Sequence, residues 1–363
     1  MTKIQLIAHR SMSNSAWSKA PADVAVIAER AGFEMFDIDC GRIDRGSFAG
    51  RVLNKLGLLT WANRLVFRRR LGKLRRQFGR ANGGELLIQH PAPVQLTEEL
   101  VRLDKLVLLK QIGVRLTVLV HDISWFHSDN PNVQDVYSFE KKLFGVADKL
   151  IVHNEHMKSY LEEQGFDKDK MVALVIFDYL IDNFPMVDKT FDSARRAQVM
   201  IAGGMGGWKA SYLEKLHLIE TVDWNLCGVE YDPIRIKGDN IYYLGSFNPD
   251  EVPFRMRGDF GLVWHGNAVN TCAGRTGEYL KINNPHKLSL YIASCMPVII
   301  WSQAAEADFV REHNLGLAVE TLEEVPRLVA GLGRANYKAM VSSVRKVGSK
   351  LRCGGFTLEA LNA

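Results

Sequence analysis

The chain has 363 residues, more than one hydrophobic core usually organises, so we predict two domains. Hydrophobic residues make up 47% and charged residues 24%, a balance that excludes a largely disordered chain. The longest uncharged apolar stretch, Leu288–Trp301, is too short to span a bilayer. The net charge is +5 at pH 7, and many of the basic residues are concentrated in one segment.

The N-terminus and the cysteines both indicate a cytoplasmic protein. The opening residues MTKIQLIAHR hold only a short apolar run before His9 and Arg10, so we expect a first strand and no signal peptide. The five cysteines are odd in number, scattered and without a CxxC pair. That pattern argues against a disulfide framework and a zinc site, and it favours a reducing compartment.

Short β-rich runs alternate with helical stretches, which predicts a parallel α/β architecture. In the first half we expect strands at 4–8, 34–38, 85–89, 115–120 and 149–152. Helices are expected at 20–31, 97–112, 132–147 and 155–164, and in the arginine-rich region. The pattern lapses at 178–196, where we place the linker. Residues 1–180 are therefore expected to form an acceptor-side Rossmann-like domain.

The arginine-rich segment Arg64–Arg80 carries eight basic residues, and no acidic residue lies between Asp44 and Glu85. Its apolar residues recur with the spacing of one helix face, at Phe67, Leu71, Leu74 and Phe78. Such a helix can dock on anionic lipid headgroups or hold a phosphate-bearing acceptor. The alternative is that the stripe packs on the core and the arginines are only solvated. Nucleic acid is disfavoured, because no binding motif and no interleaved aromatics are present.

A second α/β run begins after the linker. Strands are expected at 199–204, 224–227, 241–244, 261–264, 297–301 and 316–319, with helices at 208–220 and 321–351. We expect residues 197–335 to form a nucleotide-sugar-binding Rossmann-like domain, and 336–363 a C-terminal helix that packs back on the N-terminal domain. Two parallel sheets facing each other would place a site in the cleft at their carboxyl ends.

The stretch GRTGEYLKINNPHKLSLYIASCMPVIIW, Gly274–Trp301, is the most informative part of the second half. Asn284 and Pro285 predict a capped helix start, which leaves the backbone N–H groups of His286 and Lys287 free. Those donors, the positive helix terminus and the Lys287 ammonium suit a diphosphate. The glycine-spaced segment ahead of them could close over a ligand and supply Arg275. The alternative is an ordinary loop that enters a helix.

The loop AGGMGGWK, Ala202–Lys209, follows a strand and precedes a predicted helix. Glycines such as Gly203 and Gly204 allow the backbone to approach phosphates, and Lys209 could neutralise one. The loop lacks the GK[ST] ending of a P-loop, and many glycine-rich turns have purely steric reasons.

Several blocks resemble a bacterial GT-B family that contains β-1,6-galactofuranosyltransferases and the glucosyltransferases that extend glycans on serine-rich adhesins. They are VWHGN, the NPHK stretch and AAEADFVREHNLGLAVETLEEVPRLV in the second half, and QHP, VHDI and ADKLIVHNEHMKSYLEEQGF in the first. The resemblance covers most of the chain. It implies a fold of two Rossmann-like domains with parallel sheets facing across a cleft.

The resemblance also implies a UDP-sugar donor, bound by the second domain without a metal ion or other cofactor. Carried over by position, Asn284 and Lys287 would hold the diphosphate, and Gly203-Gly204 would face the donor. The loop Leu244–Phe247, with Ser246 and Phe247, would meet the nucleobase. The acceptor would be a lipid- or protein-linked saccharide in surface polysaccharide or glycoprotein glycan synthesis.

Two departures from the family pattern bear on the mechanism. His265 stands where members often have an acidic residue, and Leu290 replaces a carboxylate typical of retaining GT-B enzymes. We therefore expect inversion, which needs a general base near the acceptor hydroxyl. Asp122, assisted by His121, is the preferred base because both end a buried strand. His9, Asp23 and His90 are further candidates, and Asp122 as a simple helix cap is the alternative.

The triplet Asp37-Ile38-Asp39 matches the metal-binding DxD pattern, but we read it as chance because three-residue matches are common.

Two rival functions stay open. A nucleotide-sugar 2-epimerase shares the architecture and needs no acceptor site. A non-catalytic glycosyltransferase-like partner protein would be expected to have lost its diphosphate site. A peripheral position at the inner face of the cell membrane, through Arg64–Arg80, and a homo-oligomer are further expectations.

Overall fold

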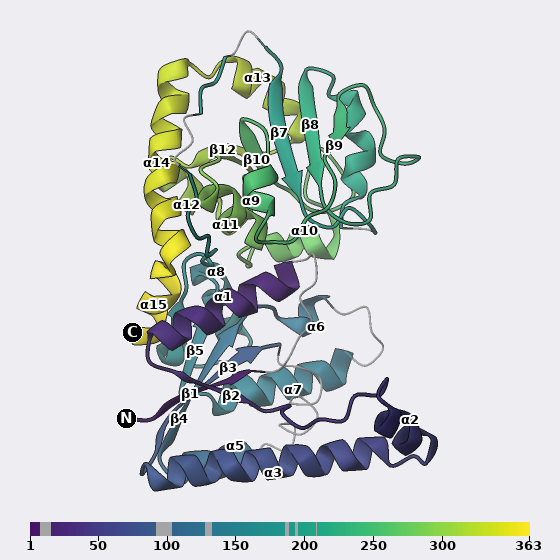
Figure 1. The fold of residues 1–363 in the computed structure, drawn as a ribbon. Coiled ribbons are helices and arrows are strands. Elements are labelled where there is room, and N and C mark those ends of the chain that lie inside the picture. Colours follow the sequence, from purple (N-terminus) through teal and green to yellow (C-terminus); the bar gives the residue numbers. More distant parts are fainter. Residues whose placement is uncertain (8–15, 92–103, 128–132, 186–188, 193–194, 208) are drawn as a thin grey trace. The chain divides into compact units, whose positions relative to one another are not determined.

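The computed structural model describes residues 1–7, 16–91, 104–127, 133–185, 189–192, 195–207 and 209–363 (Figure 1). The chain divides into two compact units. Unit 1 comprises Met1–Ser11, Ala25–Val152 and Gly165–Val172. Unit 2 comprises Met12–Val24, His153–Gln164 and Ala173–Ala363. Unit 2 therefore includes segments that precede the predicted linker.

Unit 1 is built on a six-stranded sheet in the order β2-β1-β3-β4-β5-β6. The strands are β1 (Lys3–Ile7), β2 (Glu34–Asp37), β3 (Gly84–His90), β4 (Val114–Val120), β5 (Lys149–Val152) and β6 (Met171–Ala173). The first five pair in parallel, as the alternating sequence pattern predicted. β3 and β4 are almost entirely buried, which explains their nearly continuous apolar sequence. The three-residue β6 was not predicted, because so short a strand carries no periodicity.

The helices of unit 1 are the second half of α1 (Ala16–Arg30), α2 (Phe48–Lys55), α3 (Leu59–Arg80), α5 (Asp104–Lys110), α6 (Ser124–His127) and α7 (Val133–Val146). The helix predicted at 97–112 begins outside the described residues, and its described part is α5.

α3 confirms the helix predicted in the arginine-rich segment. Its buried residues are Leu59 and the four apolar positions at helical spacing, Phe67, Leu71, Leu74 and Phe78. α2 lies at the N-terminal end of α3, apart from the strands of the unit (Figure 1). The basic side chains of α3 are therefore carried by a helix that is fixed through its apolar face.

Unit 2 is built on a second six-stranded parallel sheet, in the order β12-β11-β10-β7-β8-β9. The strands are β7 (Ala197–Ala202), β8 (Val222–Cys227), β9 (Ile241–Tyr243), β10 (Phe260–Val263), β11 (Val298–Trp301) and β12 (Gly316–Val319). This is the strand order of a dinucleotide-binding Rossmann sheet. The order reverses between β7 and β10, which are neighbours, so a crevice is expected at their carboxyl ends.

Close packing holds α11 (His286–Ala293) against this reversal point. The buried Tyr291 hydroxyl accepts a 2.8 Å hydrogen bond from the backbone N–H of Ala202 at the end of β7. A Cβ on Gly261 would lie 2.2 Å from the Tyr291 ring, so β10 needs a glycine there. Gly348 of α14 (Arg334–Cys353) likewise lets that helix approach the carbonyl of Ile292.

Some predicted helices of unit 2 differ in the structure. The helix expected at 208–220 is the 3-10 helix η2 (Ser211–Leu218), and the single-turn helix α9 (Val252–Arg255) was not predicted. The helical stretch expected at 321–351 divides into η3 (Leu322–Glu324), α13 (Val325–Ala330) and α14. α12 (Ala307–Glu312) lies between β11 and β12, and α15 (Gly355–Asn362) follows α14 after Gly354 in the left-handed conformation.

The C-terminal helices α14 and α15 belong to unit 2. The backbone N–H groups of Phe356 and Thr357 donate to the buried carboxylate of Asp178. α8 (Glu155–Glu163) is also part of unit 2. The predicted packing of the last helix on the N-terminal domain stays a prediction. Among the described residues, no helix combines the length and the apolar character needed to cross a bilayer.

Candidate functional site

The candidate donor site lies in unit 2, where the loops after β7, β8 and β10 leave the carboxyl ends of their strands. Gly203 follows β7 with a φ of 125°, and its backbone N–H donates to Cys227 O at 2.9 Å. A Cβ on Gly228 would lie 1.8 Å from the Gly203 carbonyl, so the two loops pack backbone to backbone. Gly203 and Gly204 themselves are exposed. Their bare backbone therefore offers close approach to a phosphate.

Lys287, in the first turn of α11, presents a cation beside these loops. Its Nζ lies 3.4 Å from the carbonyl oxygen of Trp264, the residue that follows β10. Burial and, to a smaller extent, the nearby charge of Lys209 lower the pKa of Lys287 to about 8. In the described part of the chain no carboxylate pairs with this ammonium. An anionic ligand would supply the missing counter-charge.

Lys209 is exposed and its side chain is a second cation on the same side of the sheet. Its carbonyl accepts a 2.9 Å hydrogen bond from the backbone N–H of Gly266, which ties the loop after β7 to the loop after β10. A Cβ on Gly266 would lie 2.4 Å from Ala273 O, so this turn also requires a glycine. The structure thus brings the predicted residues Gly203, Gly204, Lys209 and Lys287 to one edge of the sheet.

The start of α11 differs from the prediction. The N-cap residue is Pro285, and no side chain caps the helix. The Asn284 side chain instead donates to the backbone carbonyls of His153 at 2.7 Å and Val175 at 3.0 Å. Its backbone N–H donates to His153 Nδ1 at 2.8 Å. The Asn284 Oδ1 accepts from Asn154 and makes no cap bond to α11, so the expected capping role was wrong. The backbone and amide donors of Asn284 instead fix the chain that enters α11.

Asn154 and Glu306 complete this arrangement, and the sequence analysis missed both. The Asn154 amide donates to Asn284 Oδ1 at 2.5 Å and to Glu306 Oε1 at 3.3 Å. Its own Oδ1 caps α8 by accepting from Met157 N–H at 2.9 Å. Burial raises the pKa of Glu306 to about 8. An N-cap signal before α8 could have identified Asn154, whereas nothing in the sequence distinguishes Glu306 from a surface glutamate.

His286 is a neutral residue at this site. Burial and, to a smaller extent, the charge of Lys19 lower its pKa to about 3. The ring hydrogen-bonds the backbone of Asp178 and lies 5.1 Å from the ring of Tyr179. Its Nε2 is buried and has no hydrogen-bond partner among the described residues. His286 therefore contributes no positive charge at neutral pH, only its ring and its backbone at the start of α11.

Arg275, Ser246 and Phe247 lie on two further elements. Gly274–Leu280 forms the helix α10, so the prediction of a closing loop there was wrong. The helix packs closely on the preceding chain, because a Cβ on Gly277 would lie 1.8 Å from Cys272 O. Arg275 is exposed in its first turn. Ser246 and Phe247 follow β9, at the same edge of the sheet as the other candidates. The Ser246 hydroxyl is buried and has no hydrogen-bond partner among the described residues.

The candidate base lies in unit 1, at the carboxyl end of β4. His121 is the first residue after the strand; its Nε2 is 2.7 Å from Gln89 Oε1 and its backbone N–H donates to His90 O at 2.6 Å. Asp122 is the next residue, and both are half-buried. Neither belongs to a helix, and the following helix α6 begins at Ser124.

The other candidate bases have structural partners or lie outside the description. His90 Nε2 lies 2.6 Å from Glu140 Oε1, and both residues are buried. Glu140 also accepts the backbone N–H groups of Ser124 and Trp125, so this pair holds the start of α6. Asp23 is buried in a 2.8 Å ion pair with Lys19. His9 lies outside the described residues.

No group of three or more potential metal ligands occurs among the described residues. Asp37 and Asp39 of the DxD match lie at the end of β2 in unit 1. Asp37 Oδ1 accepts a 2.9 Å hydrogen bond from the backbone N–H of Asp39, which gives that carboxylate a local role.

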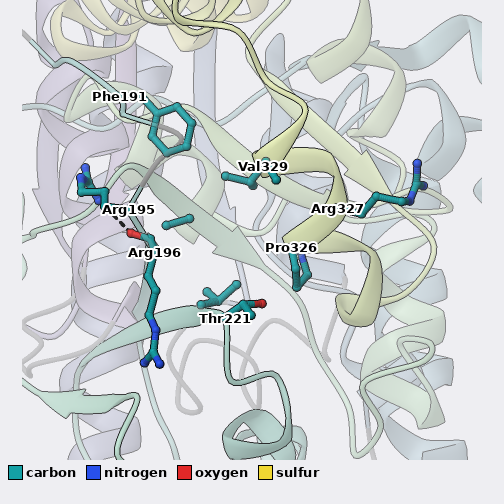
Figure 2. Close-up of a pocket in the computed structure, with 10 residues that line it drawn as sticks. Phe191, Arg195, Arg196, Thr221, Pro326, Arg327 and Val329 are labelled. Carbon is teal, nitrogen blue, oxygen red and sulfur yellow. Dashed lines mark hydrogen bonds between the residues drawn. The ribbon is translucent and has the colours of Figure 1, made fainter.

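Unit 2 also contains a cavity of about 440 Å³ that is distinct from the candidate donor site (Figure 2). It lies at the amino ends of β7 and β8, at Ala197 and Val222, whereas the candidate residues follow the carboxyl ends. Arg195 at its rim donates to Arg196 O at 3.0 Å and pairs with Asp259 at 2.6 Å. The charge of Arg195 is thus compensated by Asp259.

Comparison with known proteins places both halves of the chain in one family. The N-terminal domain of glucosyltransferase 3-like proteins matches residues 4–176, and the C-terminal domain matches residues 199–363. Beta-1,6-galactofuranosyltransferase WbbI of Escherichia coli (strain K12) is 32% identical over 250 residues, 68% of this chain and 70% of WbbI. Glucosyltransferase 3 of Streptococcus gordonii is 28% identical over 265 residues, 70% of this chain and 71% of that protein.

Two solved structures resemble the whole chain. HepE of Anabaena in complex with UDP has a TM-score of 0.60 at 12% identity and covers 99% of this chain and 98% of its own. Sucrose-phosphate synthase from Thermosynechococcus elongatus has a TM-score of 0.61 at 13% identity and covers 100% and 98%. At these identities the likeness shows the fold alone. That fold is the α/β two-domain GT-B type expected from the sequence.

Proposed function

The chain belongs to the glucosyltransferase 3-like family and is a UDP-sugar-dependent glycosyltransferase; we propose that it transfers galactofuranose or glucose to a saccharide acceptor with inversion at the anomeric carbon. The acceptor is a lipid- or protein-linked saccharide of a surface polysaccharide or glycoprotein glycan. The relatives named above, a galactofuranosyltransferase and a glucosyltransferase, support the choice of sugars.

The half-buried ammonium of Lys287 carries the assignment of the donor site. It stands at the reversal point of a Rossmann sheet, beside an exposed glycine backbone and without a carboxylate partner among the described residues. A diphosphate at this position would receive a charge-assisted hydrogen bond from Lys287 and approach the N-terminus of α11. The free hydroxyl of Ser246, with Phe247 beside it, would face the nucleobase end of the donor.

The proposed reaction is a single displacement. Asp122, assisted by His121, removes the proton from the acceptor hydroxyl while that oxygen attacks the anomeric carbon. The bond between the anomeric carbon and the UDP oxygen breaks, and UDP leaves with the electron pair. Lys287 and the first turn of α11 would stabilise the charge that develops on the leaving diphosphate. Asn284 and Asn154 act indirectly: they position the chain that enters α11, which carries Lys287.

No metal ion takes part in this proposal, because Lys287 and a helix N-terminus would neutralise the diphosphate. We further propose that the protein acts in the cytoplasm, at the inner face of the membrane, and that the basic side of α3 meets an anionic acceptor or surface there. Arg70 is the exception on that helix, since its guanidinium donates to Asp37 O at 3.0 Å and lies 4.5 Å from the Phe36 ring.

A panel of UDP-sugars with a saccharide acceptor library tests the function. We expect UDP release that depends on the acceptor and on one donor sugar, with a glycosidic product of inverted configuration. A 2-epimerase would instead convert the UDP-sugar without an acceptor and keep the nucleotide attached. A non-catalytic partner protein would give neither product.

A further inference from the structure

The tip formed by α2 and the first residues of α3 exposes large apolar side chains. We call it the apolar tip; it consists of Phe48 (79% exposed), Val52 (43%), Leu56 (64%), Leu58 (45%) and Trp61 (61%). Few other large apolar side chains among the described residues are as exposed as Phe48, Leu56 and Trp61. The apolar tip thus has five exposed large apolar side chains within fourteen consecutive positions. Such clusters are uncommon on a surface that contacts only water.

The apolar side of α2 faces solvent, because the opposite face of the helix packs on the preceding turn. Phe48, Val52 and Leu56 are spaced at i, i+4 and i+8, which places them on one face. The opposite face carries Gly50, which is buried and whose Cβ would lie 1.8 Å from Asp44 O. Ser47 Oγ caps the helix by accepting from Gly50 N–H at 3.0 Å. The helix cannot turn its apolar side inward without breaking this contact.

Basic residues surround the apolar tip. Arg45, Arg51 and Lys55 are exposed on or before α2, and α3 continues with exposed Arg64, Arg68 and Arg69. No acidic residue occurs between Asp44 and Glu85. Apolar side chains that project from a cationic surface are the pattern of a segment that lies in the interface of an anionic bilayer.

We propose that the apolar tip inserts into the boundary between the headgroups and the acyl chains of an anionic phospholipid bilayer, with the basic residues of α2 and α3 on the lipid phosphates. The occupant is the bilayer and not a second copy of the chain. A self-complementary contact through the tip would bring the cationic rims of two copies together, which electrostatic repulsion opposes. A bilayer supplies both hydrocarbon for the tip and negative charge for its rim.

This inference adds apolar insertion to the proposed electrostatic role of α3, and it does not depend on the donor site. Purely electrostatic adsorption should vanish as salt rises, because charges are screened beyond about 3 Å at 1 M salt. Burial of aromatic side chains among lipid chains should persist at high salt. The two contributions can therefore be separated by salt concentration in the same assay.

The test is co-flotation of the full chain with vesicles of phosphatidylcholine, with or without phosphatidylglycerol. The variant Phe48→Ser/Trp61→Ser removes the two largest side chains of the tip. The control Ile234→Ser/Phe254→Ser removes two exposed apolar side chains of unit 2, 80% and 51% exposed. We expect the wild type and the control to float with anionic vesicles and to keep part of this binding at high salt. The tip variant should bind at least about tenfold more weakly.

A second measurement locates the tip in the lipid. Tryptophan fluorescence of the wild type should be quenched by vesicles with brominated acyl chains, and Trp61→Phe should lose that quenching while it still floats. Equal flotation of the tip variant and the wild type would overturn the proposal. So would a dimer in lipid-free light scattering that Phe48→Ser dissociates. Transfer to a soluble acceptor by the tip variant would show that the catalytic function stands apart from this result.

Discussion

The side-chain amide of Asn154 donates a 2.5 Å hydrogen bond to Oδ1 of Asn284, which lies 130 positions further along the chain. Asn154 also caps α8, and Asn284 fixes the entry of α11. The pair thus couples the start of one helix to the start of the helix that carries Lys287. Within unit 2, the position of the candidate phosphate-binding residue is set by this buried polar contact and not by a capping side chain of its own.

Replacement of Lys287 by alanine should weaken UDP binding by about 1.5–3 kcal/mol, the range for hydrogen bonds to charged groups. Burial lowers the Lys287 pKa to about 8, so wild-type affinity should also fall as the pH rises through that value. Calorimetry at several pH values measures both effects. Lys281→Ala is the matched control, since Lys281 is half-buried and pairs with Glu278. Unchanged affinity in folded Lys287→Ala protein would remove Lys287 from the donor site.

Replacement of Asp122 by asparagine should lower kcat about 100-fold or more, since general base catalysis contributes at least that factor. UDP affinity should stay at the wild-type level, because the proposed donor contacts all lie in unit 2. Steady-state kinetics with saturating acceptor, together with UDP calorimetry, separate the two effects. Near-normal kcat would mean that Asp122 has only a structural role before α6, and the kinetics of His121→Gln would then test His121 as the base.

Activity should survive an excess of EDTA, because the proposed neutralisation of the diphosphate comes from Lys287 and a helix terminus. The measurement is UDP release before and after chelation. Asp37→Asn/Asp39→Asn serves as the companion variant and should keep full activity. The prediction is wrong if EDTA abolishes activity, Mn²⁺ or Mg²⁺ restores it, and the companion variant is also inactive. The DxD match would then be assigned to the donor site.

Glu306→Gln should change how stability depends on pH. Burial raises the Glu306 pKa to about 8 from an ordinary value of 4.5, so the folded state holds this proton more tightly than the unfolded state. The resulting stability is present below pH 4.5 and is lost as the pH rises towards 8, by about 1.4 kcal/mol per pH unit. Denaturant melts from pH 5 to 8 should show that slope in the wild type and a flatter one in the variant. Parallel curves would show that Glu306 is ionised in the folded protein.

Replacement of Arg68 and Arg69 by serine should raise the KM for an anionic acceptor and leave UDP affinity unchanged. Both arginines are exposed on α3, whereas Arg70 is held by Asp37 and Phe36. Because the effect is electrostatic, it should shrink as salt rises. Acceptor kinetics at low and high salt provide the measurement. Identical KM values at low salt would mean that these side chains are only solvated.

The sequence alone determined the fold class and the family. Parallel α/β architecture follows from local periodicity, since strands buried on both faces are continuously apolar, and β3, β4 and β11 have that pattern. The inward stripe of α3 was readable for the same reason, because helical spacing is a local property. The family blocks were contiguous in sequence, so they could be recognised without any coordinates.

Only the tertiary structure decided which residues of unit 2 meet, because those contacts join distant segments. The sequence predicted Asn284 as a helix cap, but its side-chain amide donates to the carbonyls of His153 and Val175. A buried donor must find an acceptor, and the nearest ones come from another part of the chain. Glu306 reads as a surface residue in sequence and becomes a buried acid only through packing. Local pattern predicted every strand of the two sheets except β6, whereas burial and long-range hydrogen bonding determined the roles of the side chains.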